Sequence, residues 1–513
     1  MAANTLLVTL LPTIVTFLVT SGVWVGVFFA VGLNQPSSTS NYYYGDTSQP
    51  ALPPPIPTYP PAESCPAAGT YSKCSVDCEF QICESVPDDL YDTDRGTWST
   101  TKCWLRLIES AEHEIVMGTY YWTLLEAETD KDCKDKEKCA KWSDEGKQVY
   151  DALVAAAQRG IAIRISVNTP DPNGNGFAKE HTLIEPMAIR DVNPEKVQVR
   201  SVNFTRIIGG GGILHTKESE PAKRCLKKKN NDFFSLSPWT ASTGTPGRPT
   251  LTGARSLRAT KEIGVATFNC ACVAEDLQRI LESHWYMGAE DAVLPASWPA
   301  EYTTNAGHDR PYNVPRTEGP ATAIHFSTAP PQFNACGRDN DIDNMIQMID
   351  EAEDYLYMAV MDYAPTSLFE GKTTPNIYYE RLDAAIKRAA YERFVDPGVT
   401  PCKTGSIDAR LYNLPEEGWE GVPFVRYQHT KFFISERAAF IGLFSRVRNS
   451  GTSNWAADYW INTAGISIAI RSADHGGQEQ LVDLVKKVYL EDWNSPYATP
   501  ISKFSLNGTR IED

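Results

Sequence analysis

The chain has 513 residues and a formal net charge of −16, with 42% hydrophobic and 22% charged residues. This balance is ordinary for a globular protein and excludes a largely disordered chain. An acidic surface disfavours non-specific binding to nucleic acid, although it allows a small, locally basic active site. The length accommodates a short anchor and roughly two globular domains.

The chain begins with a long apolar run. Residues 5–33 contain no charged side chain and exceed the roughly 20 residues that a helix needs to cross a bilayer. A cleaved signal peptide has an apolar core of about 7–15 residues and a basic start, whereas no Lys or Arg precedes this run. We therefore predict a transmembrane signal anchor at 5–33 behind a short cytosolic tail at 1–4, with a cleaved signal as the alternative.

The residues after this run indicate an oxidising compartment. Residues 34–73 are rich in Ser, Tyr and Pro, which predicts an extended stalk. All twelve cysteines follow the apolar run, and no Cys and His set has zinc-site spacing, so disulfides are favoured. Glycosylation sequons at Asn203 and Asn507 agree with this. We predict a single-pass type II membrane glycoprotein on the lumenal face of the endoplasmic reticulum, Golgi, endosome or lysosome.

An internal echo predicts the fold class. Residues 113–124 and 354–366 are each a short apolar, β-branched and aromatic segment typical of a strand. Each is followed by apolar residues at helical spacing, and the first helix is expected to stop at Gly160 before a second strand at 161–167. Strand, helix and strand in this order predict two similar α/β lobes, each with a mostly parallel sheet.

Two segments interrupt this pattern. Residues 218–254 show no sustained period and many loop-forming residues. Their basic run from Lys223 to Lys229 is either a nucleic-acid patch or, as we favour, a solvated loop. Residues 443–450 follow an apolar strand that ends at Gly442, and they look inserted.

Two His-x-Lys segments carry the candidate chemistry, His215-x-Lys217 and His429-x-Lys431. One such motif is expected by chance roughly once in a chain of this length. On a strand, however, residues i and i+2 point to the same face. His can act as nucleophile or as general acid and base, and Lys supplies a cation for phosphate oxygens. Two pairs, one per lobe, would form a symmetric clamp around phosphorus, with Glu436 in a position to restrain the site electrostatically.

These motifs resemble a known family. His429-x-Lys431-x4-Glu436, followed by 451–455 (GTSNW), resembles the second signature of the phospholipase D superfamily. His215-x-Lys217 resembles the start of the first signature. The resemblance runs from about residue 74 to 497 and points to the animal type II membrane branch, which includes lysosomal 5′-exonucleases of single-stranded DNA and RNA. Further segments that carry it are 120–124, 261–272, 359–363, 388–393 and 491–497.

The resemblance implies two α/β/α sandwich lobes that share one active site, here residues 74–310 and 311–513. It implies a mechanism without metal or cofactor. His215 would attack phosphorus to form a phosphohistidine, His429 would protonate the leaving oxygen, and water would resolve the intermediate. The remaining residues that the resemblance assigns to the site are Lys217, Lys431 and Asn454, which would hold phosphate oxygens, and Glu262, which would orient a catalytic His.

The resemblance also implies disulfides and an oligomer. Cys74 and Cys78 would be joined to Cys270 and Cys272, in an order that the sequence leaves open. Members of this branch commonly form homodimers, so a homodimer is a further expectation.

The first motif departs from the family pattern. The acid expected seven residues after His215 is Ala222, and the following Gly-Ser-x-Asn element is absent. Residues 218–254, 394–420 and 443–450 break the pattern, either as divergence or as errors in the translated sequence. If they are divergence, we expect the first His–Lys pair to lose its supporting strand, and we expect the strand and helix after Arg393 to be missing or replaced.

The leading functional hypothesis is a phosphodiesterase, specifically a lumenal 5′-to-3′ exonuclease on single-stranded DNA or RNA. One alternative is a catalytically inactive relative with a binding or scaffold role. A second is a phospholipid hydrolase or transphosphatidylase, because lipid headgroups present the same phosphodiester. Tyr121 and Trp122 are candidates for base stacking, although we expect them in the core.

Overall fold

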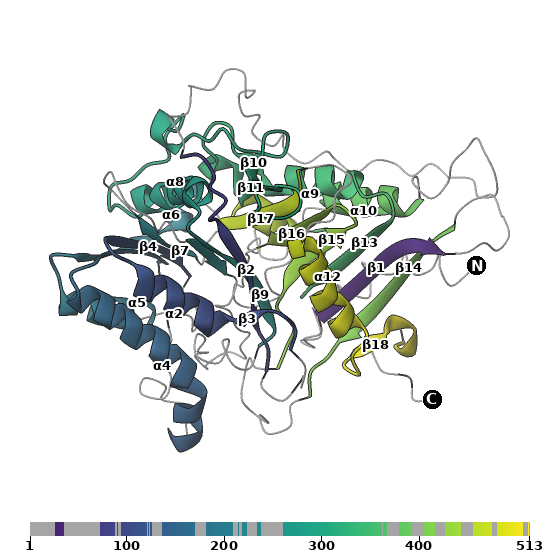
Figure 1. Cartoon of the computed structure of the whole chain (residues 1–513), viewed down its shortest axis with the longest axis horizontal. Coiled ribbons are helices and arrows are strands. Elements are labelled where there is room, and N and C mark those ends of the chain that lie inside the picture. Colours follow the sequence, from purple (N-terminus) through teal and green to yellow (C-terminus); the bar gives the residue numbers. More distant parts are fainter. Residues whose placement is uncertain are drawn as a thin grey trace.

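Two β-sheets form the centre of the molecule in this computed structural model (Figure 1). The strands of one sheet lie between residues 79 and 268, and nine of the ten strands of the other lie between 312 and 500. The residues that the structure describes are 26–34, 72–87, 90, 94–120, 122, 124–125, 136–169, 181–208, 214, 218–222, 233–236, 260–361, 363–366, 379–391, 404–415, 426–442, 455–473, 480–505 and 511.

The first sheet has eight strands in the order β3-β2-β9-β8-β7-β4-β5-β6. Strands β4, β5 and β6 run parallel, as do β2 and β3, and the other neighbours are antiparallel. The bounds are β2 (Glu79–Ser85), β3 (Trp98–Ser99), β4 (Glu114–Thr119), β5 (Ala162–Asn168), β6 (Val197–Val202), β7 (Glu218–Ala222), β8 (Phe233–Leu236) and β9 (Glu262–Phe268).

The second sheet has ten strands in the order β10-β11-β17-β16-β15-β13-β1-β14-β18, with β12 paired to β11. Only the β11–β12 pair is parallel. The bounds are β1 (Gly26–Asn34), β10 (Tyr312–Val314), β11 (Thr322–Ala329), β12 (Asp339–Asn340), β13 (Tyr355–Val360), β14 (Thr404–Tyr412), β15 (Lys431–Ser435), β16 (Ala438–Gly442), β17 (Gly465–Ser472) and β18 (Ala498–Pro500).

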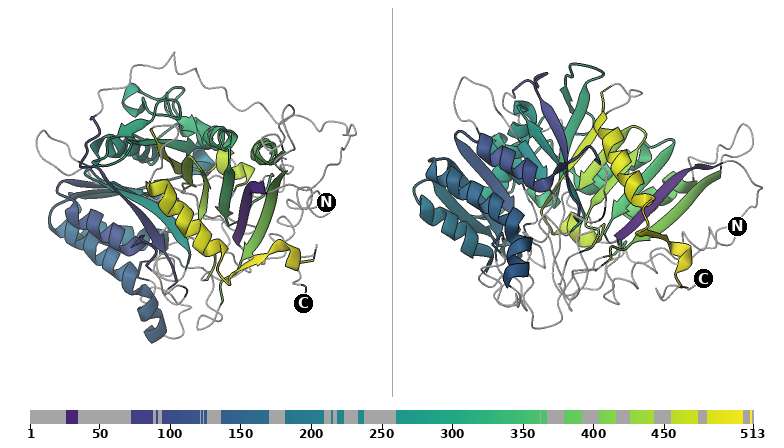
Figure 2. Two further views of the ribbon diagram at one scale, coloured as in Figure 1. Left: turned by 45° about the vertical axis from the view of Figure 1, so that its right-hand side comes forward. Right: turned by 60° about the horizontal axis from the view of Figure 1, so that its bottom comes forward.

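Helices cover the outer face of each sheet and fill the space between the sheets. Helices α2, α4 and α5 pack on the outer side of the first sheet, and α9, α10 and α11 pack on the outer side of the second. Figure 2 shows α12, in yellow, between the two sheets. The bounds are α2 (Thr100–Ser110), α4 (Lys136–Gln158), α5 (His181–Val192), α6 (Phe204–Ile208), α8 (Ala271–Met287), α9 (Asp341–Asp350), α10 (Arg381–Tyr391), α11 (Ala457–Ile461), α12 (Gln480–Trp493), and the 3₁₀ turns η2 (Ala300–Tyr302), η3 (Pro331–Phe333) and η4 (Ile501–Lys503).

One apolar core joins the two halves. Helices α8 and α12 lie between the sheets, and each contacts strands of both. Every residue of β9 and of β15 is buried, because both faces of these strands are covered. Such strands read as continuous apolar runs rather than as alternating ones. The shared core fixes one half against the other, which any site built from both halves requires.

A buried ion pair crosses the same boundary. The guanidinium of Arg338, just before β12, donates to both carboxylate oxygens of Asp276 on α8 at 2.7 Å. Both side chains are buried. A bidentate pair of this kind compensates the cost of removing two charges from water only while both partners are present.

Disulfides tie the start of the folded region to α8. Cys74 is joined to Cys272, and Cys78 is joined to Cys270. The predicted partners are therefore confirmed, and the order that the sequence left open is fixed. A third disulfide, Cys83–Cys103, joins β2 to α2 and was not predicted.

The prediction of a βαβ unit in each half is confirmed only in part. Strand β4, helix α4 and the parallel strand β5 follow the predicted order, and Gly160 has the positive φ of 81° expected at a helix stop. The prediction of mostly parallel sheets is wrong. Most strand pairs are antiparallel, because the strand that follows each His-x-Lys motif pairs antiparallel to its neighbours rather than crossing over through a helix.

Two of the interrupted segments contain strands. Within 218–254, β7 begins directly after Lys217 and pairs with β4, and β8 pairs with β7 and β9. The expectation that the first His–Lys pair loses its supporting strand is therefore wrong. Within 394–420, β14 supplies a strand after α10, so the expected loss of that strand is wrong, whereas the expectation for the helix stays untested. Residues 443–450 lie outside the described residues.

The apolar N-terminal run also differs from the prediction. Residues 26–34 form β1, which pairs with β13 on one side and β14 on the other, rather than the end of a helix over 5–33. Residues 1–25 and most of the predicted stalk at 34–73 lie outside the described residues. Among the helices that the structure describes, none is long and apolar enough to cross a membrane.

The boundary ion pair gives a stability prediction. Replacing Arg338 by Met should lower the free energy of unfolding by about 3–5 kcal/mol, since Asp276 would keep a buried carboxylate without its cation. The matched control is Arg388→Met, because Arg388 and Asp350 form an ion pair whose side chains are each 38% exposed. The control should cost about 0–1 kcal/mol. Urea unfolding of both variants measures this, and equal midpoints would contradict the prediction.

Candidate active site

A carboxylate from the first sheet holds a histidine that belongs to the second. Glu262, the first residue of β9, has its Oε1 2.6 Å from Nδ1 of His429, which lies just before β15. Both side chains are fully buried. A buried carboxylate at this distance fixes the orientation and tautomer of the imidazole, with Nδ1–H donated to Glu262. The predicted orienting role of Glu262 has this geometry.

The backbone brings these two residues together. Lys261 pairs with Gln428 in an isolated parallel bridge. The N–H of His429 donates to the carbonyl of Lys261 at 2.9 Å, and the N–H of Lys261 donates to the carbonyl of Tyr427 at 3.1 Å. These hydrogen bonds join the start of β9 in one sheet to the segment that precedes β15 in the other, at the residue before Glu262.

The lysine of the second motif lies against its histidine, as the i and i+2 spacing predicts. Nζ of Lys431 lies 2.5 Å from Nδ1 and 2.6 Å from Nε2 of His429, and it also donates to the carbonyl oxygen of that residue. Lys431 is buried, so its ammonium acts in a water-poor site where a charge has a strong effect. The two side chains project together from the start of β15.

The residue before the first motif, Leu214, also lies where the two halves meet. Leu214 is fully buried, forms a parallel bridge with Ala464 of the other half, and donates its N–H to Oδ1 of Asn168 at 2.9 Å. His215 and Lys217 lie outside the described residues, but the residue before them and strand β7 after them are described. Leu214, the residue before His215, is thus held between β5 and the residue that precedes β17.

For Asn454, predicted to hold phosphate, the structure likewise describes a neighbouring residue. Asn454 lies outside the described residues. The next residue, Trp455, is buried and bridges in parallel to Tyr363, and its carbonyl accepts from the N–H of Ala364 at 3.1 Å. The backbone directly after Asn454 is therefore fixed to the end of the β13 segment.

Glu436 lies away from these residues. It follows β15, whereas His429 precedes it, so about 20 Å of extended chain separates the two. The Glu436 carboxylate accepts the N–H groups of Glu353 and Asp354 at 2.8 and 3.1 Å. Its position fits a cap for the turn before β13 and does not fit the electrostatic restraint of the site that we expected.

The structure also places some of the remaining residues that the sequence analysis named. Trp122 is buried and donates to the hydroxyl of Thr119 at 2.7 Å, so its predicted core position is confirmed. Oδ1 of Asn203 accepts the N–H of Arg206 at the start of α6. Tyr121 and Asn507 lie outside the described residues. In the part of the chain that the structure describes, no group of three or more His, Cys, Asp or Glu is arranged to hold a metal ion.

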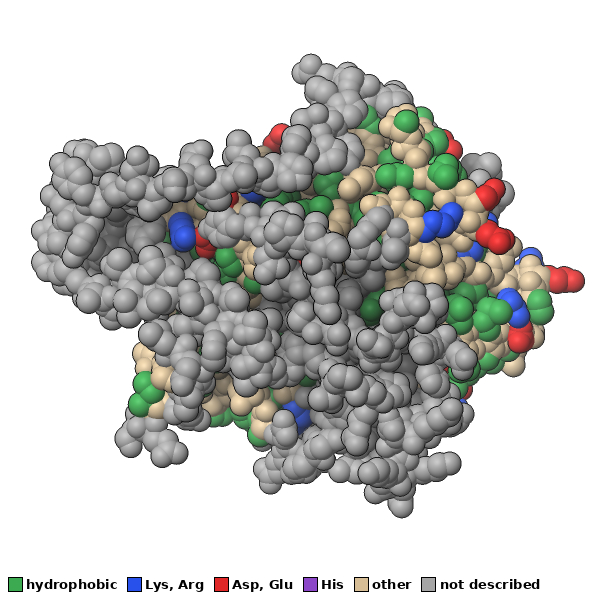
Figure 3. Space-filling view, turned by 180° about the vertical axis from the view of Figure 1, so that it is seen from behind, with side chains coloured by type: hydrophobic (Ala, Val, Ile, Leu, Met, Phe, Trp, Pro, Cys, Tyr) green, Lys and Arg blue, Asp and Glu red, His purple; other side chains and the backbone are tan. Residues whose placement is uncertain are grey.

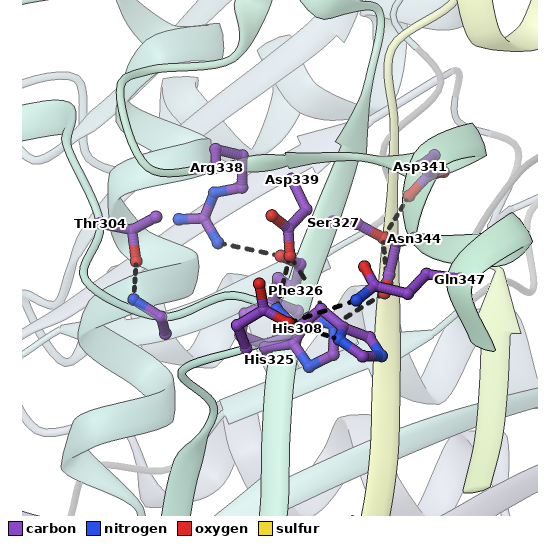
Figure 4. Close-up of polar contacts among 12 residues, drawn as sticks. Thr304, His308, His325, Phe326, Ser327, Arg338, Asp339, Asp341, Asn344 and Gln347 are labelled. Atoms are coloured by element: carbon purple, nitrogen blue, oxygen red, sulfur yellow. Dashed lines mark hydrogen bonds and ion pairs between the residues drawn. The ribbon is translucent and has the colours of Figure 1, made fainter. Parts of the chain in front are cut away.

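A second polar group, which we call the histidine cluster, is built on the segment before β10 and on β11, β12 and α9 (Figure 4). Its members are His308, His325, Asp339, Asp341 and Asn344. The two imidazole rings meet edge to face at 5.7 Å, and Nε2 of His325 lies 3.0 Å from Oδ1 of Asn344. The backbone N–H of His308 donates to Asp339 at 2.6 Å. Sequence reasoning did not find this cluster.

Burial sets the charge states within the histidine cluster. Burial lowers the pKa of His325 to about 3, which keeps its ring neutral. Burial raises the pKa of Asp341 to about 7, although the hydroxyls of Ser327 and Ser467 donate to its two oxygens at 2.7 and 2.9 Å. Burial alone would lower the pKa of His308, but its hydrogen bonds with Glu351 and Asp309 and the charge of Glu351 together outweigh this, and the pKa is raised.

The geometry around His429 can perform acid–base work. With Nδ1–H held by Glu262, Nε2 is the nitrogen that transfers a proton. The ammonium of Lys431 beside it can stabilise negative charge that develops on a phosphate oxygen. An imidazole fixed by a carboxylate and flanked by an ammonium, where two α/β halves meet, has the acid, base and cation that a phosphodiesterase centre needs.

Comparison with known proteins agrees with this class. A family model described as "PLD3/4, PLD-like domain" matches residues 237–400. The chain is 29% identical over 463 residues to the 5′-3′ exonuclease PLD3 of Xenopus laevis, covering 84% of this chain and 83% of that protein. It is 28% identical over 453 residues to the 5′-3′ exonuclease PLD3 of Homo sapiens, covering 83% and 81%. The chain is thus similar to the phospholipase D superfamily and, within it, to the PLD3 proteins.

More distant likenesses were also found. A probable phospholipase D of Caenorhabditis elegans is 28% identical over 461 residues, covering 83% of this chain and 71% of that protein. The crystal structure of Nuc, a phospholipase D family member from Salmonella typhimurium, matches with a TM-score of 0.26 and 16% identity, covering 41% of this chain and 97% of that one.

Sequence reasoning missed the residues that hold the two halves in register. Asn168 positions Leu214, and the bridge between Lys261 and Gln428 positions His429. Asn168 did carry a signal, because it is the first polar residue after the apolar strand at 161–167 and so lies at a strand end. The bridge carried none, since it pairs residues 167 positions apart.

The histidine cluster gives a prediction about pH. The pKa of Asp341 is raised from 3.8 to about 7, so this group favours the folded state below pH 3.8 and loses that contribution as pH rises through 7. An Asp341→Asn variant lacks this dependence. Its stability relative to the parent should therefore increase from pH 4.5 to pH 7.5, by at most about 1.4 kcal/mol per pH unit. Urea midpoints at both pH values measure the difference.

The control for this prediction is Asp343→Asn on the same helix, since the Asp343 side chain is 47% exposed. His325 titrates in the opposite sense, but it is present in the parent and both variants and so cancels from the comparison. Parallel pH curves for parent and Asp341→Asn would contradict the assignment of a protonated, buried carboxyl group.

Proposed function

We propose that the protein is a 5′-to-3′ exonuclease of single-stranded DNA or RNA that works through a phosphohistidine intermediate. The observation that carries the proposal is the Glu262–His429–Lys431 arrangement at the boundary of the two halves. Relatives named 5′-3′ exonuclease match this chain over most of their own length, which supports the choice of substrate.

In the proposed reaction, Nε2 of His215 attacks phosphorus while the bond from phosphorus to the leaving oxygen breaks. His429 gives its proton to that oxygen. His429 then takes a proton from water, the resulting hydroxide attacks phosphorus, and the phosphorus–nitrogen bond breaks. Lys217, Lys431 and Asn454 hold the non-bridging oxygens during both steps, and Glu262 keeps His429 oriented.

The presence of Ala222 where the family pattern has an acid does not argue strongly against phosphodiesterase activity. Ala222 ends β7 and pairs with Glu114 at the start of β4, just as Glu436 follows β15 near the start of β13. The corresponding acid in the second half caps backbone N–H groups beyond the end of β15, whereas His429 precedes that strand. The missing acid therefore removes a remote cap rather than a reacting group, which supports an enzyme over an inactive relative.

The surface supports selective rather than non-specific binding. On the face shown in Figure 3, the described Lys and Arg side chains are scattered, and several of them lie beside Asp or Glu. Together with the net charge of −16, this favours a substrate held at the site over a nucleic acid spread across the surface.

We further propose that the two halves face a lumen such as that of the lysosome, behind a membrane anchor. The protein would form a homodimer. Because β1 occupies residues 26–34, the anchor would comprise the uncharged residues 5–25, still about the 20 residues needed for a span. The disulfides that join residues 74–83 to the first half support an oxidising compartment.

The activity test uses 5′-labelled and 5′-blocked single-stranded DNA oligomers at pH 5 and pH 7. We expect stepwise digestion that requires a free 5′ end. His429→Ala should lower kcat by about 10²- to 10⁴-fold, since it removes the general acid. His113→Ala, at an exposed position before β4, should retain parental activity.

Two outcomes would replace the proposal. No digestion by folded protein would favour a binding or scaffold role. Release of headgroup from phosphatidylcholine vesicles, with no digestion of DNA or RNA, would favour a phospholipid hydrolase.

A further inference from the structure

Five charged side chains lie together between the two sheets, next to Glu262. We call them the interlobe ion cluster. They come from β2, the segment before β3, the residue before β9, and the end of α12: Glu84, Arg95, Lys261, Glu491 and Asp492. Four of the five are at most 5% exposed, Glu491 being the exception.

The cluster is closely connected. Arg95 forms ion pairs with Glu84, Glu491 and Asp492 at 2.9–3.0 Å. The ammonium of Lys261 forms ion pairs with Glu84 and with Asp492, the second at 3.2 Å. Glu84 belongs to the first sheet and Asp492 to the helix that covers the second, so Lys261 joins the two halves through its side chain.

Lys261 also joins the halves through its backbone. It accepts the N–H of His429 and donates to Tyr427, while the next residue, Glu262, binds the imidazole. Successive side chains of an extended segment point to opposite faces. The Lys261 side chain therefore enters the ion cluster on one face while the Glu262 side chain reaches His429 on the other. A displacement of Lys261 would move the carboxylate that orients the imidazole.

We propose that Lys261 is a positioning residue, which holds Glu262 against His429 by tying its strand to Glu84 and Asp492. The inference rests on the proposed function, since it concerns the same His429 acid–base step. A misplacement of about 1 Å in such a constellation can cost about 100-fold in rate. Substrate contacts would be less affected, because the cluster lies behind Glu262 rather than beside the phosphate-binding lysines.

The test is a double-variant cycle on the full chain, with kcat and KM measured on single-stranded DNA. The variants are Lys261→Met, Glu262→Gln and the two combined. We expect Lys261→Met to lower kcat by about 100-fold while KM changes by less than about threefold. If Lys261 acts through Glu262, it should cost little more once Glu262 is already Gln, so the two effects should not add.

The controls separate positioning from loss of folding. Lys147→Met removes a cation whose side chain is 52% exposed, and it should leave kcat unchanged. Thermal unfolding is measured for every variant. If Lys261→Met does not fold, Asp492→Asn takes its place in the cycle, because it weakens the same ion pair while keeping the Lys261 side chain.

Each outcome has a defined meaning. Non-additive losses in kcat support the positioning role. Additive losses, a change confined to KM, or parental kcat in folded Lys261→Met or Asp492→Asn would overturn it. A parent protein without activity would instead refute the proposed function, so the two failures are distinguishable.

Discussion

The contact between Glu262 and His429 is the constraint on which the rest of the structure depends. Its two partners belong to different sheets and lie 167 residues apart in the chain, so no local element can hold them together. The contact exists because α8 and α12 fill the space between the sheets and because the backbone of Lys261 pairs with that of Gln428. Packing brings the halves close, and hydrogen bonds set their register.

Charges at this boundary are matched to the carboxylates they face. Arg338 meets Asp276, Arg95 meets Glu84 and Asp492, and each pair is buried. Buried ion pairs contribute little net stability, but losing one partner leaves the other charged and desolvated. The free-energy cost of an alternative packing that separates such a pair therefore exceeds the net stability that the pair contributes to the native packing. That asymmetry suits a site whose parts come from both halves.

Local pattern was a good guide to local structure. Apolar periodicity predicted β4, α4, β5 and β13 because each depends on neighbours within a few residues. Spacing also predicted that His429 and Lys431 would project together. The pairing of Cys74 and Cys78 with Cys270 and Cys272 followed from family resemblance rather than from spacing.

The predictions that failed concern residues whose structure depends on contacts with distant parts of the chain. Strands β7 and β14 lie in segments of mixed composition, and their strand conformation comes from pairing with β4 and β1 rather than from their own sequence. The apolar residues of β1 satisfied the pattern of a membrane helix equally well, since hydrophobicity alone does not separate a span from a strand inside a sheet. Glu436 was assigned to the site from the motif spacing. That spacing alone does not reveal that strand β15 lies between Glu436 and His429.

The two disulfides at the start of the folded region have a consequence for the intact chain. Because Cys74 and Cys78 are bonded to Cys272 and Cys270, with sequence separations of 198 and 192, most of the first half lies inside one closed covalent ring. A protease that cuts the chain between β7 and β8 opens this ring without releasing a fragment. The nicked protein would migrate as one species until its disulfides are reduced, and the residues on both sides of the cut would stay tethered to the same site.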